Sequence, residues 1–138
     1  MIWIKPAWKW NPHDFLAARR LKNAAFPSAK EVRWWEHLSW WWGGGWRGCH
    51  FLLSGRQRIG YARVNHLGTV SVMVEEEYRG HGYGFSLLYH LRWAEKGTLI
   101  ANIASDNAAS LALFRRAGYE ESPISLPSGY RVMVSYDR

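Results

Sequence analysis

The chain has 138 residues, 48% of them hydrophobic, and a formal net charge of +7. This length suffices for one domain with a sizeable core and is short for two, so we expect residues 1–138 to form a single domain. The longest apolar runs fall well below the roughly 18 residues that a membrane-spanning helix needs, and the N-terminus lacks signal-peptide features. We therefore expect a soluble, cytoplasmic protein without a membrane partner.

The positive charge favours anionic partners, such as nucleic acid or a phosphate-bearing cofactor or substrate. The only cysteine, Cys49, excludes an internal disulfide. The histidines are scattered, with no pair at i and i+4, and no Cys/His spacing is typical of structural zinc. We expect no metal.

The first part of the chain predicts a strand and two helices. Residues 2–5 have the pattern of a short strand, which Pro6 closes. A helix through about residue 23 should follow, with Asn11 or Asp14 as its N-cap. Ser28 and Glu31 have the spacing of a capping box, which predicts a second helix over residues 29–42.

The second predicted helix has two different faces. Hydrophobic residues at the spacing of a core-facing stripe are Trp34, Trp35, Leu38, Trp41 and Trp42. Burial of so many of the tryptophans counts against a role as stacking platforms for bases. The opposite face either lines a substrate cleft or is an ordinary solvent-facing surface. Its members, the candidate substrate-binding residues, are Arg33, Glu36, His37 and Trp40.

The rest of the chain alternates between strands and helices. Strands are predicted over residues 49–53, 59–65 and 69–74, and the short turns between them favour an antiparallel meander. A helix over 85–95, a strand over 99–104, a helix over 107–117 and a closing strand over 130–136 should follow. The order β-α-α-β-β-β-α-β-α-β predicts an α/β (α+β) fold with one mixed central sheet.

The stretch YRGHGYG at residues 78–84 places three glycines at alternate positions between a predicted strand and a predicted helix. Glycines allow positive φ and bring backbone amides close to a ligand, and the N-terminus of a helix favours an anion. A Rossmann fingerprint is not favoured because an antiparallel meander precedes the stretch, and a P-loop is excluded because no Gly-Lys-Ser/Thr follows. Alone, the stretch fits either a phosphate site or a plain turn.

Two motifs together resemble those of the Gcn5-related N-acetyltransferase (GNAT) superfamily. The first, Arg/Gln-x-x-Gly-x-Gly/Ala between a strand and a helix, is matched by Arg79, Gly82 and Gly84. The second, Asn-x-x-Ser/Ala-x-x-Leu-aromatic followed by Gly-Phe/Tyr, is matched by Asn107, Ser110, Leu113, Phe114, Gly118 and Tyr119. The expected strand lies between the motifs, and the order of elements agrees over nearly the whole chain.

The resemblance implies an N-acetyltransferase that moves an acetyl group from acetyl-CoA directly to a primary amine. It implies that CoA lies in a V-shaped opening between the strands at residues 69–74 and 99–104, with its pyrophosphate on amides of residues 79–84. The implied cofactor-binding residues are Val72, Met73, Val74, Arg79, Gly80, His81, Gly82, Tyr83, Gly84, Asn107, Ser110 and Phe114.

Proton transfer is the least defined part of the implied mechanism. An amine with a pKa of about 10 must lose a proton before it attacks, and the departing thiolate needs a hydrogen bond or a proton. Phe114 stands where the family often has tyrosine, which leaves Ser110 or a water as the donor. Glu75, His66 and His37 are candidate bases, although Glu75 also begins an acidic run that is typical of a solvated surface.

The acceptor is suggested by a likeness in the N-terminal part to GNAT enzymes that act on amino sugars of nucleotide sugars. It is carried by Leu21-Lys22-Asn23, Glu36-His37-Leu38-Ser39-Trp40 and Ile59-Gly60-Tyr61-Ala62-Arg63. We expect a small, anionic amine such as an amino-sugar nucleotide. The alternatives are a protein N-terminus, aminoacyl-tRNA, and a non-catalytic module that binds CoA or nucleic acid. A homodimer stays open.

Overall fold

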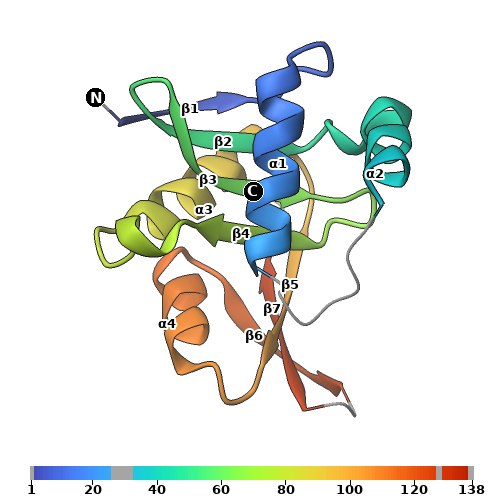
Figure 1. The fold of residues 1–138 in the computed structure, drawn as a ribbon. Coiled ribbons are helices and arrows are strands. Elements are labelled where there is room, and N and C mark those ends of the chain that lie inside the picture. The colour runs from blue at the N-terminus through green and yellow to red at the C-terminus, as the bar shows by residue number, and fades with distance from the viewer. Residues whose placement is uncertain (1, 26–32, 127–128, 137–138) are drawn as a thin grey trace.

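The computed structural model describes residues 2–25, 33–126 and 129–136. The predicted order of elements is confirmed, with one strand added before the last. Figure 1 labels the elements, which are β1 (Ile2–Pro6), α1 (Pro12–Ala25), α2 (Trp34–Trp40), β2 (Cys49–Ser54), β3 (Gln57–Val64), β4 (Val70–Val74), α3 (Tyr83–Ala94), β5 (Leu99–Ala104), α4 (Ala108–Arg116), β6 (Glu120–Leu126) and β7 (Tyr130–Ser135).

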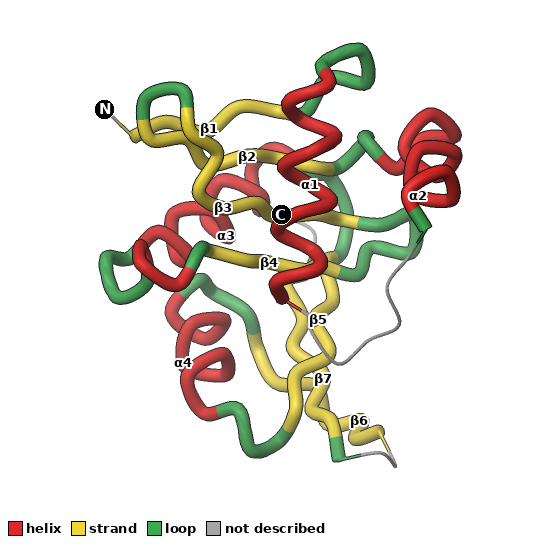
Figure 2. Tube along the Cα trace, viewed as in Figure 1, coloured by secondary structure: helices red, strands yellow, loops and turns green. Residues whose placement is uncertain are grey.

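The strands form two antiparallel sheets that meet at one point. The first has the order β1-β2-β3-β4 and the second β5-β7-β6. They are joined where Thr69 and Ile100 form a parallel bridge, beside which the Ile100 amide donates to the Gly68 carbonyl at 2.8 Å. Beyond this bridge β4 pairs with β3 and β5 pairs with β7, so the two central strands part. Figure 2 shows the second sheet leading away from the first, with α4 beside it.

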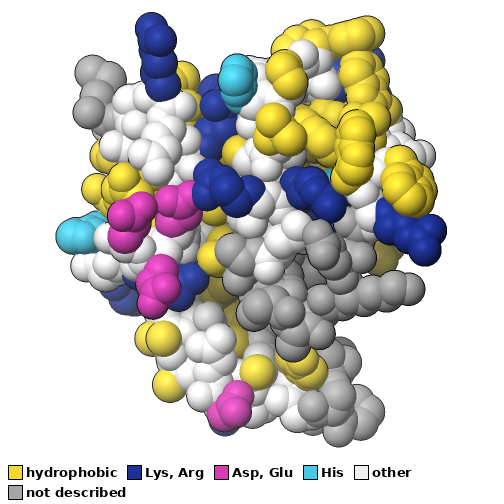
Figure 3. All heavy atoms as spheres, in the orientation of Figure 1, with side chains coloured by type: hydrophobic (Ala, Val, Ile, Leu, Met, Phe, Trp, Pro, Cys, Tyr) yellow, Lys and Arg dark blue, Asp and Glu magenta, His cyan; other side chains and the backbone are white. Residues whose placement is uncertain are grey.

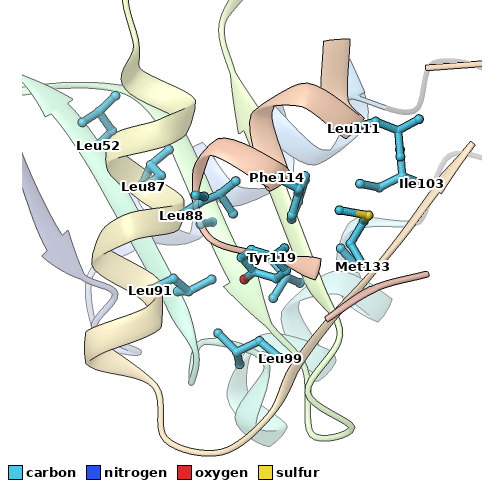
Figure 4. Close-up of a cluster of buried hydrophobic side chains, with 14 of the residues drawn as sticks. Leu52, Leu87, Leu88, Leu91, Leu99, Ile103, Leu111, Phe114, Tyr119 and Met133 are labelled. Atoms are coloured by element: carbon cyan, nitrogen blue, oxygen red, sulfur yellow. The ribbon is translucent and has the colours of Figure 1, made fainter. Parts of the chain in front are cut away.

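Helices cover both faces of the first sheet and divide the core in two. α1 crosses one face and α3 lies on the other (Figure 1). The larger cluster joins α3 and α4 to both sheets, and its centre includes the fully buried Leu87, Leu88 and Leu91 of α3 (Figure 4). The smaller cluster, beneath α1, includes Leu21 and Phe51. Among the helices described, none has the length and apolar character needed to cross a membrane.

The predicted core stripe of the second helix is wrong. Trp34, Trp35 and Trp42 are exposed by 56%, 59% and 43%, whereas Trp41 is fully buried. The helical period ends early, because α2 stops at Trp40 and a π-helical turn over Trp41–Gly45 follows. The side facing α1 is therefore not the predicted one. Figure 3 shows the hydrophobic side chains gathered over α2. The predicted capping box and residues 29–32 lie outside the described residues.

The strand β6 was not predicted, and its sequence explains why. Pro123 lies inside it, and the pairing of β6 with β7 is irregular between Glu121 and Ser125. Proline cannot donate to a ladder and is tolerated at the edge of a sheet, which is where β6 lies. Because proline interrupts the strand pattern of residues 120–126, this edge strand was not recognised in the sequence.

A buried carboxylate joins α1 to the first sheet. Asn11 caps α1, since its Oδ1 accepts from the His13 amide at 2.9 Å, which leaves Asp14 for another role. Asp14 is fully buried and accepts from Lys5 Nζ at 2.7 Å and Arg58 Nε at 2.6 Å. It also accepts from the Trp8 amide at 3.0 Å. One side chain thus links β1, the loop after it, α1 and β3.

We predict that Asp14→Asn destabilises the protein by about 3–5 kcal/mol, because it leaves two cations beside a buried site without their counter-charge. Urea unfolding followed by circular dichroism measures this change. The control is Glu121→Gln, whose carboxylate pairs with Arg115 at the surface and should cost less than about 1 kcal/mol. Equal unfolding midpoints for Asp14→Asn and the unmodified protein would contradict the role given to Asp14.

Candidate functional site

The first part of the site is the free edge of β4. β4 is the last strand of its sheet, and its residues Val70–Val74 pair only with β3 among the described strands. The side chains of Val72 and Val74 pack on the α3 side and that of Met73 on the α1 side. What this edge offers to a ligand is therefore backbone N–H and C=O groups, which suit an extended chain.

A glycine loop lies at the end of β4. Gly80 and Gly82 have φ of +84° and +82°, in the left-handed region that favours glycine. Gly82 is the N-cap of α3, and the first amides of that helix have no intrahelical acceptor. Arg79 Nε donates to the Val74 carbonyl at 3.0 Å, which ties the loop to the strand. Free amides and a helix N-terminus beside a strand edge fit a phosphate or pyrophosphate group.

The other predicted loop residues lie nearby. The ring centroids of His81 and Tyr83 are 5.7 Å apart at the N-terminal end of α3. Gly84 lies in the first turn of α3, where an added Cβ would be 3.1 Å from Leu113 of α4. The absence of a side chain at Gly84 thus allows α3 and α4 to approach closely.

The predicted residues of α4 have structural roles in the fold. Asn107 is the N-cap, since its Oδ1 accepts from the Ser110 amide at 3.2 Å. Ser110 is partly exposed in the first turn. Phe114 is 4% exposed and meets Tyr119 edge to face, with ring centroids 4.9 Å apart.

Two of the predicted bases lie apart from the rest. Glu75, just beyond β4, forms an ion pair with Arg20 of α1. Arg20 also donates to the Arg58 carbonyl at 2.8 Å. His66 is exposed in the turn between β3 and β4. Neither side chain lines the pocket described next.

A pocket of about 50 Å³ lies on the face of the first sheet that carries α1 and α2. We call it the α1/α2 pocket; it is lined by Ala18, Lys22, His37, Trp40, Cys49, Tyr61, Arg63 and Ser71. Of the predicted substrate residues, His37 and Trp40 are in it. Arg33 and Glu36 are exposed outside it, and Arg33 lies over the Trp35 ring at 5.3 Å.

The predicted site residues did not include the pocket residues of the strands, although Tyr61 and Arg63 belong to the N-terminal likeness that suggested the acceptor. Cys49 pairs with Arg63, and Arg63 pairs with Ser71, so the three side chains form a row across β2, β3 and β4. The period of two along a strand puts such partners on one face. Combining the predicted meander with strand alternation could have identified this row.

The electrostatics of the pocket are unusual. Lys22 Nζ and the Arg63 guanidinium lie over the Trp40 indole, 5.2 Å and 4.6 Å from its centroid. Arg63 Nε and His37 Nε2 are buried without a hydrogen-bond partner among the described residues. Burial, followed by the charge of Arg63, lowers the pKa of Lys22. Burial and the nearby cations, Lys22 first, lower the pKa of His37 to about 4.

Trp40 is held in place by the glycines that end α2. A Cβ at Gly45 would clash with the Trp40 indole, so this position must be glycine for the ring to occupy its place. Cys49 Sγ donates to the Gly45 carbonyl at 3.3 Å. Gly45 therefore leaves the space that the Trp40 ring occupies in the wall of the pocket.

The strand β4 thus has an anion-binding loop at its end, a free edge for an extended ligand, and a pocket on one face. This arrangement suits a group-transfer protein, in which a donor and an acceptor approach one strand. Residues 15–119 match the Acetyltransferase (GNAT) family. The chain belongs to this family, which confirms the predicted fold and the predicted relationship to acetyltransferases.

Solved structures agree in fold. The ribosomal-protein-alanine N-acetyltransferase of Brucella melitensis is 24% identical over 97% of this chain and 99% of its own, with a TM-score of 0.78. YncA of Salmonella typhimurium, solved with acetyl-CoA, is 23% identical over 99% of this chain and 94% of its own, with a TM-score of 0.77. The phosphinothricin acetyltransferase of Sinorhizobium meliloti, also solved with acetyl-CoA, is 18% identical over 99% of this chain and 88% of its own, with a TM-score of 0.79.

A curated relative matches part of the chain. N-alpha-acetyltransferase RimI of Mycobacterium tuberculosis is 33% identical over 76 residues. The match covers 49% of this chain and 48% of that protein, so the chain spans about half the length of this relative.

We predict that His37 makes the protein less stable as the pH is lowered from about 6.5 to about 4. Its pKa is lowered from 6.5 to about 4 in the folded protein, so acid protonates the unfolded chain first and favours unfolding. This contribution is fully present above pH 6.5 and is lost as the pH falls through that window. Thermal unfolding at a series of pH values should show a shallower fall for His37→Gln. His66→Gln, in an exposed turn, should follow the unmodified protein, and parallel curves for all three would refute the assignment.

We predict that Cys49 does not react with Ellman's reagent in the folded protein at pH 8. Burial raises the pKa of its thiol to about 12, and the thiolate is the reactive form. Because Cys49 is the only cysteine, one thiol per chain should appear only after denaturant is added. Rapid labelling without denaturant would show that the pocket opens to solvent.

Proposed function

We propose that residues 1–138 act as one acetyltransferase domain that moves an acetyl group from acetyl-CoA to the primary amine of a small, anionic acceptor by direct transfer. One observation carries this proposal. The strand β4 has a free edge that leads into the glycine loop, and one of its faces carries Ser71 in the cationic α1/α2 pocket. A donor on the edge and an acceptor in the pocket would approach the same strand from two sides.

The residues toward the donor fit the chemistry of CoA. Amides from residues 80–84 would hold the pyrophosphate, since the Arg79 amide already donates to the Glu76 carbonyl at 3.2 Å. The backbone of Val72, Met73 and Val74 would pair with the pantetheine arm. A backbone amide of β4 would stabilise the negative charge that develops on the thioester oxygen. When bound, acetyl-CoA supplies a thioester whose C–S bond breaks as the new C–N bond forms.

The transfer needs two further groups. The first accepts a proton from the amine, and the second gives a proton or a hydrogen bond to the sulfur of CoA. We assign the second role to Ser110, a partly exposed hydroxyl in the first turn of α4, since Phe114 has no hydroxyl and is buried. For the first role, the ion pair of Glu75 with Arg20 and the exposure of His66 favour water as the proton acceptor. His37, neutral above pH 4, is suited to accept a hydrogen bond from the amine and orient it.

A second candidate acceptor is a protein N-terminus. The partial match to RimI and the fold of the Brucella ribosomal-protein-alanine enzyme favour it. A pocket of about 50 Å³ favours a small acceptor instead. Amino-sugar nucleotides, which the N-terminal likeness suggested, have no support from these relatives and enter only as members of a substrate panel.

Release of free CoA thiol, measured with Ellman's reagent, tests the proposal. The panel contains amino acids, amino-sugar nucleotides, polyamines and peptides that begin with alanine. Activity on a small anionic amine supports the proposal, and activity only on peptides favours the second candidate. No release with any amine, together with no protection from thermal unfolding by millimolar acetyl-CoA, would overturn both.

We predict that Gly82→Val abolishes protection by acetyl-CoA. A side chain at φ of +82° costs about 1–2 kcal/mol and moves the amides of the loop. The matched control is Gly55→Val, because Gly55 also has positive φ, at +62°, and has open space around it in the β2–β3 turn. Thermal unfolding with and without acetyl-CoA should show protection for the control alone. Equal protection in both variants would remove the loop from the cofactor site.

A further inference from the structure

The α1/α2 pocket contains two cations that have no counter-charge among the described residues. Lys22 and Arg63 both line it, and neither forms an ion pair with an acidic residue in the described part of the chain. The buried carboxylate of Asp14 already forms ion pairs with Lys5 and Arg58. Half-buried cations side by side repel each other and have lost part of their hydration.

The indole of Trp40 compensates only in part. Both cations lie over its ring, at 5.2 Å and 4.6 Å, which is the geometry of a cation–π contact. The ring leaves the hydrogen-bonding capacity of the guanidinium unused, since Arg63 Nε is buried and unpartnered within the described residues. His37, which is 3% exposed, has an unpartnered Nε2 as well and lines the same pocket. A ligand that accepts hydrogen bonds from the cations and contacts the imidazole would satisfy these groups.

We propose that the α1/α2 pocket binds a carboxylate carried by the acceptor amine, so that the substrate class is an amino acid. This inference rests on the proposed acetyltransferase function and specifies its acceptor. A guanidinium binds a planar carboxylate through two parallel hydrogen bonds, and a lysine adds a second charge. A pocket of about 50 Å³ has room for such a group of a few heavy atoms.

The position of the pocket places the amine where the reaction needs it. Arg63 on β3 and Ser71 on β4 are direct cross-strand partners, and such partners have Cβ atoms about 4.5–5.5 Å apart. A carboxylate on Arg63 therefore leaves an amine a few bonds away beside Ser71, on the strand whose edge faces the donor. His37 Nε2 then accepts a hydrogen bond from that amine. Lys22, Arg63, Ser71 and His37 would set specificity and position the acceptor.

The experiment compares amino acids with their carboxamides, which keep the amine and remove the negative charge. Thiol release from acetyl-CoA should favour α-, β- or γ-amino acids over the matched amides by at least about 10-fold in kcat/KM. Aminophosphonates test whether a tetrahedral anion is accepted in place of the planar one. Equal rates for acids and amides, or acetylation of peptide N-termini alone, would overturn the inference and leave acetyltransfer itself intact.

Variants then assign the preference to the pocket. Arg63→Met should raise KM for the amino acid by about 10- to 100-fold while leaving KM for acetyl-CoA and the rates with carboxamides unchanged. Arg63→Lys should recover part of the loss, because it restores charge without the bidentate fork. The matched control is Arg47→Met, since Arg47 also lies over an indole, that of Trp46 at 5.6 Å, and is outside the pocket. A preference for acids that persists in Arg63→Met would overturn the inference.

Binding in the absence of CoA separates this inference from the proposed function. N-acetyl amino acids carry the same carboxylate and need no turnover, so isothermal titration measures the anion site directly. We expect binding to the unmodified protein and to Arg47→Met, and at least about 10-fold weaker binding to Arg63→Met. No binding to the unmodified protein overturns the anion site. Binding that depends on Arg63, with no acetyl transfer to any amine, retains the site and overturns the enzyme function.

Discussion

The structure depends on the parting of β4 from β5. The two strands touch where Thr69 bridges Ile100, and from there each pairs with a different neighbour. β4 consequently has three distinct surfaces. One face packs Val70, Val72 and Val74 against the core beneath α3, and the other presents Ser71 and Met73 toward α1. Its outer edge retains backbone groups that no described strand uses, and the glycine loop begins where that edge ends.

Two buried charged sites on the same sheet show how differently the fold treats charge. Asp14 is fully buried, yet three donors from β1, β3 and the intervening loop satisfy it. Lys22 and Arg63 have only the Trp40 ring among the described residues. A satisfied buried group contributes to a unique fold, whereas an unsatisfied one costs free energy in the absence of a ligand. The contrast separates an element that holds the domain together from one that is prepared for binding.

The sequence predicted those features that are encoded locally. The glycine loop and the helix that follows Asn107 each depend on residues within one or two turns, and both occur in the structure. The face of α2 was wrong because its direction depends on the π turn that follows it. Contacts between distant segments were also out of reach. For example, His50 Nε2 lies 2.9 Å from Glu95 Oε1, and His50 Nδ1 lies 3.1 Å from His90 Nε2. No sequence motif connects residues 50, 90 and 95.

The exposed tryptophans bear on the alternative of nucleic-acid binding. Their predicted burial had counted against base stacking, and that argument no longer holds. The geometry supplies another. Trp10 meets Trp42 at an interplanar angle of 82°, and Trp8 meets Trp46 at 79°. Lys9 and Arg47 lie over two of these rings. Bases stack on flat, open aromatic faces, whereas these rings meet edge to face and are partly covered by cations. The cations over Trp10 and Trp46 thus occupy ring faces that a base would need, which counts against these indoles as stacking platforms.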